Sequence, residues 1–182
     1  MKAIILAGGF GTRLGSLTEA TPKCMLPVMG KPMINYTINR MKRQGITDIT
    51  LALGYKAEAF LEKYSHMKHK IETEPLGTGG AIKNCIEGNE PVLVVNGDTI
   101  CPMDYNDLRA SHIRDIAIAV DKNTTSAGIY IIDPRIFAKF PQKAFSLEKD
   151  VIPRVAVSHY PIPWFSDYGT PEAYEKACKD WV

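Results

Sequence analysis

Apolar and polar stretches alternate along the chain, and their spacing predicts strands and helices in turn. Short apolar runs typical of strands occupy residues 2–7, 49–53, 92–95, 116–120 and 127–132, and the more polar residues 69–72 are a further strand candidate. The stretches between them carry helical spacing or helix-start signals, which predicts helices over residues 33–44, 56–64, 78–86, 104–112 and 171–181. Gly45 ends the first of these helices, and Pro171 lies at the first position of the last.

Strands that alternate with helices predict an α/β fold of three layers (α/β/α), in which helices cover both faces of a mostly parallel sheet. The 182 residues suffice for one domain with a sizeable core, so we expect a single domain over residues 1–182. Ligands of such sheets bind beyond the carboxyl ends of the strands. Residues 8–14 and 96–98 directly follow predicted strands, so we expect both segments to face one crevice.

Residues 8–14, with the sequence GGFGTRL, form the most informative segment. Three glycines in four residues allow a tight turn whose N–H groups can lie against a bulky anion. Arg13 lies in the turn, and Lys23 and Lys31 follow it, so amides and fixed cations are combined as a polyphosphate requires. The segment lacks the third glycine of a dinucleotide fingerprint and the Gly-Lys-Ser/Thr of a Walker loop.

Asp98 follows a fully apolar strand, which places its carboxylate at the rim of the sheet, where a hard cation can bind. An equally good interpretation is an aspartate that caps a turn after Asn-Gly. His66 and His69 resemble a metal pair only in spacing, and we interpret them as part of a solvated loop.

Composition excludes several classes of function. The net charge of +2 includes no run of like charges that would indicate a nucleic-acid partner. No apolar stretch reaches the ~18 residues of a membrane span, and the first residues are predicted to form a core strand, so we expect no membrane partner and no signal peptide. The four cysteines have no metal-binding spacing, and reduced thiols suit a cytoplasmic protein.

Residues 3–34 resemble the signature of the sugar-1-phosphate nucleotidyltransferases, also called nucleoside-diphosphate-sugar pyrophosphorylases. The family pattern is LAGGxGTRL, PLT, PKPMLPV and KPMI, and this chain has LAGGFGTRL, SLT, PKCMLPV and KPMI. Ser16 and Cys24 are the two departures, each in place of a proline. The resemblance implies the Rossmann-like, nucleotide-diphospho-sugar transferase type of fold, with one nucleotidyltransferase domain over residues 1–182.

The resemblance also implies a catalytic set. Asp98 in VNGD and Asp167 in WFSDYGTPE correspond to the ligands of Mg²⁺, the expected cofactor. Arg13 is expected to hold the leaving pyrophosphate, and Lys23 to stabilise charge at the transferring centre. A sugar 1-phosphate oxygen would attack the α-phosphorus in line, without a general base. Asp167 has an alternative interpretation as a loop aspartate before a helix that Thr170 caps.

The nucleotide-binding residues that the resemblance implies come from three segments, one of them a second glycine turn, EPLGTGGA, at residues 74–81. They are Leu6, Ala7, Gly8, Gly9, Gly11, Thr12, Arg13, Glu74, Pro75, Gly77, Thr78, Asn96 and Gly97. Glu74 could accept hydrogen bonds from N1–H and the 2-amino group of guanine, which favours GTP mildly. The alternative is that Glu74 is a solvated strand end.

The sugar-binding half departs most from the family. The segments between residues 120 and 127 and between 153 and 164 are short, and the lysine that grips the sugar phosphate has no clear equivalent, although Lys122 and Lys149 are candidates. Gly128 and Glu148 are the implied sugar-phosphate-binding residues, and FSLEKD around Glu148 resembles the heptose 1-phosphate guanylyltransferases. A helix start capped by Ser146 explains that segment equally well. We expect the acceptor pocket to be open, or completed by a second subunit of a homo-oligomer.

The leading hypothesis is a shortened guanylyltransferase that joins GTP to a heptose or mannose 1-phosphate and releases pyrophosphate, in nucleotide-sugar biosynthesis for a capsule or lipopolysaccharide. One alternative is a cytidylyltransferase that uses CTP and a non-sugar phosphate acceptor. Another is a non-catalytic, nucleotide-binding regulatory subunit, against which the presence of all four catalytic and metal-binding residues argues.

Overall fold

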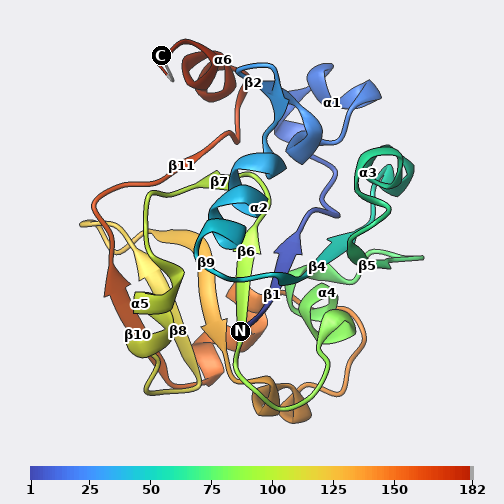
Figure 1. Cartoon of the computed structure of the whole chain (residues 1–182). Helices are drawn as coiled ribbons and strands as arrows, with labels where there is room; N and C mark the ends of the chain where they lie inside the picture. The colour runs from blue at the N-terminus through green and yellow to red at the C-terminus, as the bar shows by residue number, and fades with distance from the viewer. Residues whose placement is uncertain (181–182) are drawn as a thin grey trace.

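The computed structural model describes residues 1–180 of the chain. Seven strands form the central sheet in the order β10-β8-β9-β6-β1-β4-β5 (Figure 1). Their bounds are β1 (Lys2–Leu6), β4 (Asp48–Leu53), β5 (Lys68–Ile71), β6 (Val92–Asn96), β8 (Ile116–Val120), β9 (Ser126–Ile132) and β10 (Val157–Pro161). Four of the six neighbouring pairs are parallel, and β9 runs against both of its neighbours. The predicted mostly parallel sheet is therefore confirmed.

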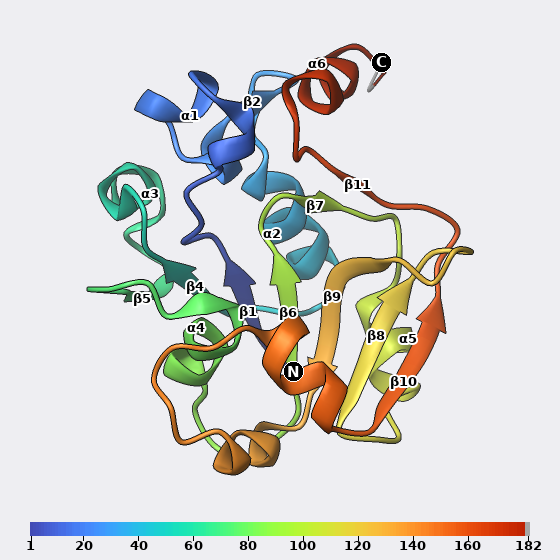
Figure 2. The same ribbon diagram turned by 180° about the vertical axis from the view of Figure 1, so that it is seen from behind.

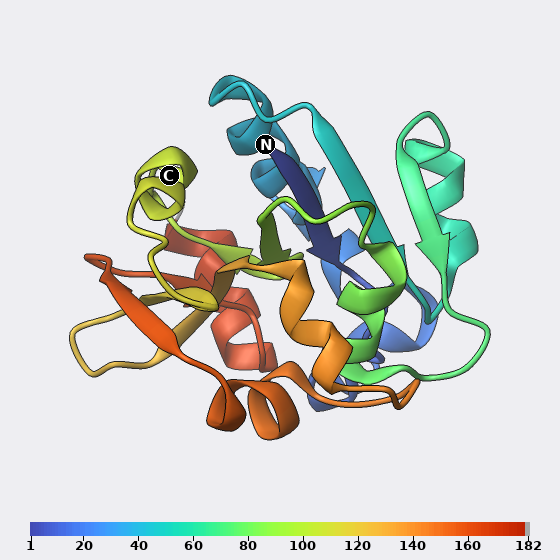
Figure 3. The ribbon, with the colours of Figure 1, turned by 90° about the horizontal axis from the view of Figure 1, so that it is seen from below.

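Helices lie on both faces of the sheet, as Figure 3 shows from below. They are α1 (Leu17–Ala20), α2 (Ile34–Arg43), α3 (Ala57–Tyr64), α4 (Gly77–Cys85), α5 (Tyr105–Ala110) and α6 (Pro171–Asp180). Helices α2 and α5 lie in front of the sheet in Figure 1, and α4 with residues 147–154 lies in front of it in Figure 2. The three-layer fold class predicted from the sequence is confirmed.

Alternating side chains of the strands divide the core into two clusters. In β1, Ala3 and Ile5 join one buried cluster with Phe60 of α3, whereas Ile4 joins another with Ile82 of α4. This division follows from the two-residue period of a strand, which sends neighbouring side chains to opposite faces. Because both faces are covered, β6 and β8 consist of apolar residues along almost their whole length.

The structure adds elements that the apolar pattern did not indicate. Strand β10 lies at the edge of the sheet, and short helical turns occupy Pro134–Lys139, Leu147–Val151 and Ile152–Arg154. Two small antiparallel pairs join β2 (Pro27–Val28) to β3 (Lys31–Pro32) and β7 (Thr99–Ile100) to β11 (Ser166–Asp167). The predicted last helix is observed to Asp180, and its predicted final residue, Trp181, lies outside the described residues. None of the helices in residues 1–180 combines the length and apolar character of a membrane span.

Candidate active site

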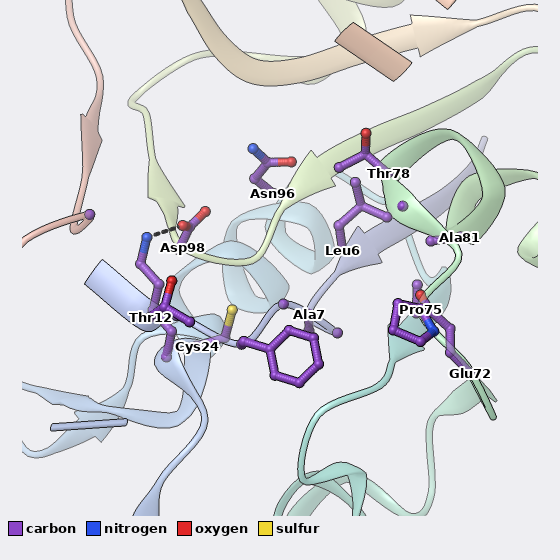
Figure 4. A pocket seen from close by; sticks show the side chains of 18 of the residues that line it. Leu6, Ala7, Thr12, Cys24, Glu72, Pro75, Thr78, Ala81, Asn96 and Asp98 are labelled. Atoms are coloured by element: carbon purple, nitrogen blue, oxygen red, sulfur yellow. Dashed lines mark hydrogen bonds and ion pairs between the residues drawn. The ribbon is translucent and has the colours of Figure 1, made fainter. Parts of the chain in front are cut away.

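A cavity of about 420 Å³ opens beyond the carboxyl ends of β1, β4 and β6. Most of the residues predicted to bind nucleotide or catalyse transfer line it: Leu6, Ala7, Gly8, Gly9, Gly11, Thr12, Arg13, Lys23, Pro75, Gly77, Thr78, Asn96 and Asp98. In Figure 4, Thr12 and Asp98 lie at one end of the cavity and Pro75 and Ala81 at the other. The two polar segments expected to share a crevice do so.

The first glycine turn is held by its neighbour strand. Ala7 N–H donates to the carbonyl of Ala52 at 2.9 Å, and Tyr55 N–H donates to the carbonyl of Gly8 at 3.1 Å. A Cβ on Gly8 would lie 3.0 Å from the backbone nitrogen of Gly54, so a side chain there would push the two segments apart. Gly11 has a φ of 66°, a left-handed conformation that other residues rarely adopt. The glycines therefore set the path of the turn.

Arg13 projects from this turn toward the C-terminal segment. Its guanidinium lies against Gly169, where an added Cβ would come within 3.1 Å of Nη2. The side chain is exposed, and it has no ion-pair partner among residues 1–176. Tyr168, beside Gly169, is buried in a cluster with Val28, Met33 and Ile100, which fixes this part of the wall. The guanidinium of Arg13 is therefore positioned by a buried part of the fold and accessible to an anionic ligand.

Lys23 and Asp98 form an ion pair inside the cavity, in which Lys23 Nζ donates to Asp98 Oδ2 (Figure 4). Their side chains are 10% and 22% exposed, so neither charge is fully hydrated. Gly97 brings Asp98 to this position, because its N–H donates to the carbonyl of Leu6 at 2.9 Å. Gly97 itself does not line the cavity, and a Cβ there would meet that same carbonyl at 3.0 Å.

Cys24, next to Lys23, is a buried residue of the cavity wall. Burial, with a smaller contribution from the charge of Asp98, holds the pKa of its thiol far above the ordinary range. The thiol therefore stays protonated and acts as an apolar part of the wall.

Asp167 is exposed and does not line the cavity, but the fold brings its backbone close to Asp98. It pairs with Thr99 in the antiparallel contact of β11 and β7, and Thr99 directly follows Asp98. Among the described residues there is no cluster of three or more His, Cys, Asp or Glu that could hold a metal by itself. Two carboxylates nevertheless suit Mg²⁺, which commonly binds one or two carboxylates together with substrate phosphates.

Glu72 and Glu74, the two acidic residues before the second glycine turn, lie in different environments. Glu74 lies at the surface in an ion pair with Lys143, outside the cavity lining. Glu72, which the sequence analysis did not select, lines the cavity. Burial raises the pKa of Glu72, and the hydrogen bond that it accepts from Leu76 N–H at 3.2 Å opposes this effect.

The residues predicted for the sugar side lie just behind the cavity wall. Gly128 has a φ of 68° and packs so tightly on the side chain of Asn96 that a Cβ would overlap it. Glu148 Oε2 accepts a hydrogen bond from Thr78 Oγ1 at 2.6 Å, and Asn96 and Thr78 both line the cavity. Neither Gly128 nor Glu148 lines it directly. Each is therefore one contact away from the space that a ligand would fill.

The helix start capped by Ser146, one of the two interpretations of the Glu148 segment, is observed, whereas sugar binding by Glu148 stays a prediction. Ser146 Oγ caps the short turn by accepting from Lys149 N–H at 3.2 Å, and it also donates to Glu148 Oε2 at 3.0 Å. Tyr130 OH lies 3.4 Å from Glu148 Oε1, and burial raises the pKa of Tyr130 to about 12. The phenol thus remains a donor at neutral pH. The two lysine candidates of this half, Lys122 and Lys149, do not line the cavity.

Six cavity residues were missed by sequence reasoning: Phe10, Cys24, Ala52, Glu72, Ala81 and Gly169. Gly169 could have been found, because it follows Asp167 by two positions in a segment already singled out. Ala52 and Ala81 carry no chemical signal. They line the cavity because β4 and α4 both pack against β1, from whose end the first glycine turn extends.

Comparison with known proteins agrees with this geometry. Residues 2–127 match the nucleotidyl transferase family. The D-glycero-alpha-D-manno-heptose 1-phosphate guanylyltransferase of Aneurinibacillus thermoaerophilus is 30% identical, with 99% of this chain and 98% of that protein covered. The alignment extends over 225 residues, so the relative has segments without counterpart in this chain of 182 residues.

Two further similarities extend the comparison. The probable mannose-1-phosphate guanylyltransferase 2 of Oryza sativa subsp. japonica is 32% identical over 86% of this chain, which spans only 56% of that relative's length. The crystal structure of HddC from Yersinia pseudotuberculosis complexed with GMP-PN is 32% identical, with a TM-score of 0.85 over 100% of this chain and 99% of that one. The chain therefore belongs to the nucleotidyl transferase family, and the resemblance to heptose and mannose 1-phosphate guanylyltransferases is confirmed.

Proposed function

We propose that this protein is a guanylyltransferase that joins GTP to a heptose or mannose 1-phosphate and releases pyrophosphate. One observation carries the proposal: Arg13, Lys23 and Asp98 line the same cavity as the first glycine turn. A heptose 1-phosphate guanylyltransferase that aligns with nearly the whole chain supports the choice of base and acceptor. The CTP-using alternative and the regulatory alternative have no observation that favours them.

The phosphate end of the cavity supplies the charges that nucleotidyl transfer needs. Arg13 has no carboxylate partner among residues 1–176, so its guanidinium can bind the departing pyrophosphate without breaking any ion pair described there. The backbone of the first glycine turn lines the same end and can hold phosphate oxygens. Lys23 lies deeper, and its ammonium can stabilise the α-phosphate when Asp98 is engaged elsewhere.

Asp98 and Asp167 would together hold Mg²⁺. Asp98 directly precedes β7, and Asp167 lies in β11, which pairs with β7, so the backbones of the two residues lie close together. Carboxylate oxygens suit this cation. Bound there, the ion would neutralise charge between the attacking phosphate and the α-phosphate. In its absence Lys23 neutralises Asp98, which keeps the half-buried carboxylate from being left unpaired.

The acceptor would bind on the side of Asn96 and Thr78. Gly128 packs on the first residue, and Glu148 accepts a hydrogen bond from the second, so the side-chain amide of Asn96 and the hydroxyl of Thr78 are held at the cavity wall, where they suit a polyhydroxylated sugar. The attacking phosphate is already ionised at neutral pH, so this side needs to orient the acceptor and has no proton to remove.

A panel of GTP, ATP, CTP and UTP against heptose, mannose and glucose 1-phosphates, with Mg²⁺ present, tests the proposal through pyrophosphate release. We expect GTP with a manno-configured sugar 1-phosphate to give the highest rate, and removal of Mg²⁺ with EDTA to abolish it. A highest rate with CTP and a phosphorylated amine would support a cytidylyltransferase instead. Nucleotide binding without release under all conditions would indicate a regulatory subunit.

A further inference from the structure

The second glycine turn, residues 74–81, forms the end of the cavity away from its charged groups. Pro75, Thr78 and Ala81 line the cavity there, and in Figure 4 Pro75 and Ala81 lie at the opposite end from Asp98. A nucleotide whose phosphates lie beside Asp98 would therefore place its nucleoside against this turn. The position of the turn sets the shape of the space that the nucleoside would fill.

Phe145 holds this turn, although it does not itself line the cavity. Its N–H donates to the carbonyl of Leu76 at 2.9 Å, and its carbonyl accepts from Gly79 N–H at 3.0 Å and from Gly80 N–H at 3.2 Å. The first four N–H groups of a helix have no partner within that helix, so Phe145 satisfies two of those of α4. Three hydrogen bonds thus join the turn and the start of α4 to a single residue.

The glycines of the second turn are explained by this contact. A Cβ on Gly79 would lie 2.4 Å from Cδ2 of Phe145, and a Cβ on Gly77 would lie 2.6 Å from the carbonyl oxygen of the same residue. A Cβ on Gly80 would lie 2.5 Å from the carbonyl oxygen of Lys143. Gly79 lies in α4 without a positive φ, so its backbone alone would accept alanine, a better helix former. The ring of Phe145 is what excludes a side chain there.

The ring of Phe145 is anchored in the core. Phe145 is 6% exposed, and its ring centroid lies 5.7 Å from that of Phe140 and 6.0 Å from that of Phe137. Lys83 of α4 donates from Nζ to the carbonyl of Phe140 at 2.6 Å. Helix α4 is therefore tied to the same aromatic group at its first turn and at Lys83, and a closely packed ring leaves that first turn little freedom to move.

The segment of Phe145 also fixes Thr78, whose residue lines the cavity. Leu147 N–H donates to Thr78 Oγ1 at 2.8 Å, and Thr78 Oγ1 donates to Glu148 Oε2 at 2.6 Å. The hydroxyl of Thr78 is thus held from two directions by residues that follow Phe145 by two and three positions. Displacement of Phe145 would release both the backbone of the turn and this side chain.

We propose that Phe145 is a positioning residue for nucleotide binding that acts through the second glycine turn; this inference rests on the proposed function in that a nucleotide must occupy the cavity. A turn held in place by the core does not have to be ordered when the nucleoside binds, which saves that entropy cost. Removal of the ring restores the cost and weakens binding. The groups beside Asp98, at the other end of the cavity, are left unchanged, so the rate of the bound complex changes little.

The test exchanges size between Phe145 and Gly79. Wild type, Phe145→Val, Gly79→Ala and the double variant are titrated calorimetrically with GTP and with CTP in the presence of Mg²⁺. We expect each single variant to bind GTP about tenfold more weakly than the wild type. In the double variant the added methyl group occupies space that the ring has left, so we expect an affinity within about threefold of the wild type and tighter than that of either single variant.

Phe60→Val is the matched control, because Phe60 of α3 is fully buried in the other core cluster. Phe60→Val and Phe145→Val should lower Tm by similar amounts, about 5 to 10 °C, whereas only Phe145→Val should weaken GTP binding. Pyrophosphate release is measured on the same samples. We expect the KM for GTP to rise about tenfold in Phe145→Val while kcat stays within about twofold of the wild type. Phe145→Leu, which removes less of the ring, is measured alongside in case Phe145→Val does not fold.

The outcomes separate this inference from the proposed function. Unchanged GTP affinity in the Phe145 variants, an equal loss in Phe60→Val, or a double variant that binds no tighter than the singles would overturn the inference. The predicted pattern of binding without pyrophosphate release from the wild type would contradict the proposed function alone. A wild type that prefers CTP would contradict only the proposed base, and the size exchange would then be measured with CTP. A wild type that binds neither nucleotide would overturn both.

Discussion

The phosphate end and the sugar side of the cavity are built in different ways. The phosphate end consists largely of consecutive residues of one turn, whose path is set by glycines and by hydrogen bonds to β4. The sugar side depends on contacts between residues far apart in sequence, such as Gly128 with Asn96 and Glu148 with Thr78. A locally determined turn can be preserved while the segments around the sugar side change in length.

The alignment with the heptose 1-phosphate guanylyltransferase fits this difference, because the chain aligns from end to end yet lacks segments of that relative. The nucleotide side needs a fixed backbone to surround phosphates. The sugar side needs only enough polar groups to orient hydroxyls, and these can come from different segments. Five substitutions, from the largest expected effect to the smallest, test whether the two sides are as separable as the structure indicates.

Replacement of Arg13 by Ala should have the largest effect on turnover. Arg13 lines the phosphate end, and its guanidinium has no ion-pair partner in residues 1–176, so we expect its loss to remove charge stabilisation and to leave folding intact. We expect kcat/KM to fall about 10³-fold or more, with an unchanged Tm. Pyrophosphate release and thermal unfolding measure the two quantities, and an active Arg13→Ala protein would refute the role of this residue.

Variants of the Lys23–Asp98 pair should change the free energy of unfolding and the catalytic rate differently. Lys23→Met leaves Asp98 half-buried without a partner, so we expect a loss of about 2 kcal/mol in the free energy of unfolding and about 10²-fold in kcat. Adding Asp98→Asn to it removes the unpaired charge. The double variant should recover most of the stability in urea unfolding and none of the activity. Recovery of both would show that the pair is only structural.

Gly9 at the phosphate end and Gly128 on the sugar side allow a matched comparison of the two sides. Around Gly9 a Cβ would meet nothing within 4 Å, so Gly9→Ala should leave the free energy of unfolding within about 0.5 kcal/mol of the wild type. The methyl group would occupy space at the phosphate end and raise the KM for nucleotide about tenfold.

Gly128→Ala should behave in the opposite way. Its φ of 68° and its overlap with Asn96 predict a loss of about 2 kcal/mol in stability. Its effect on KM should appear for the sugar phosphate and not for the nucleotide. Equal effects of both alanines on both substrates would show that the two sides are not separable.

Gly169→Ala should have the smallest effect. An added Cβ would lie 3.1 Å from Arg13 Nη2, at the end of a flexible side chain, so the guanidinium would shift by a few tenths of an ångström while the fold stays stable. We expect a three- to tenfold loss in kcat/KM, measured by pyrophosphate release, with an unchanged Tm. The Arg13→Ala, Gly169→Ala double variant should be no worse than Arg13→Ala alone, because both changes act through the same guanidinium.

Sequence reasoning succeeded where structure is local. The glycine turn directly follows the first strand, and the Asn-Gly-Asp segment directly follows the strand at residues 92–95, so the succession of strand and turn predicted both the elements and the shared crevice. Strand β10 was missed because it is an edge strand with exposed positions such as His159 and Pro161, and its apolar pattern is weak. Glu72 and Glu74 differ only through a bend between them, and no periodicity in the sequence indicates which one faces inward.

The pairing of β11 with β7 affects when the cavity rim can form during synthesis of the chain. The family match ends at residue 127, yet the support of Arg13 and one proposed magnesium ligand come from residues 167–169. A nascent chain could form the central strands β1, β4 and β6 well before these residues leave the ribosome. Assembly of this rim therefore waits until residues 167–169 have been synthesised, so a chain terminated before them would lack both the support of Arg13 and the second proposed metal ligand.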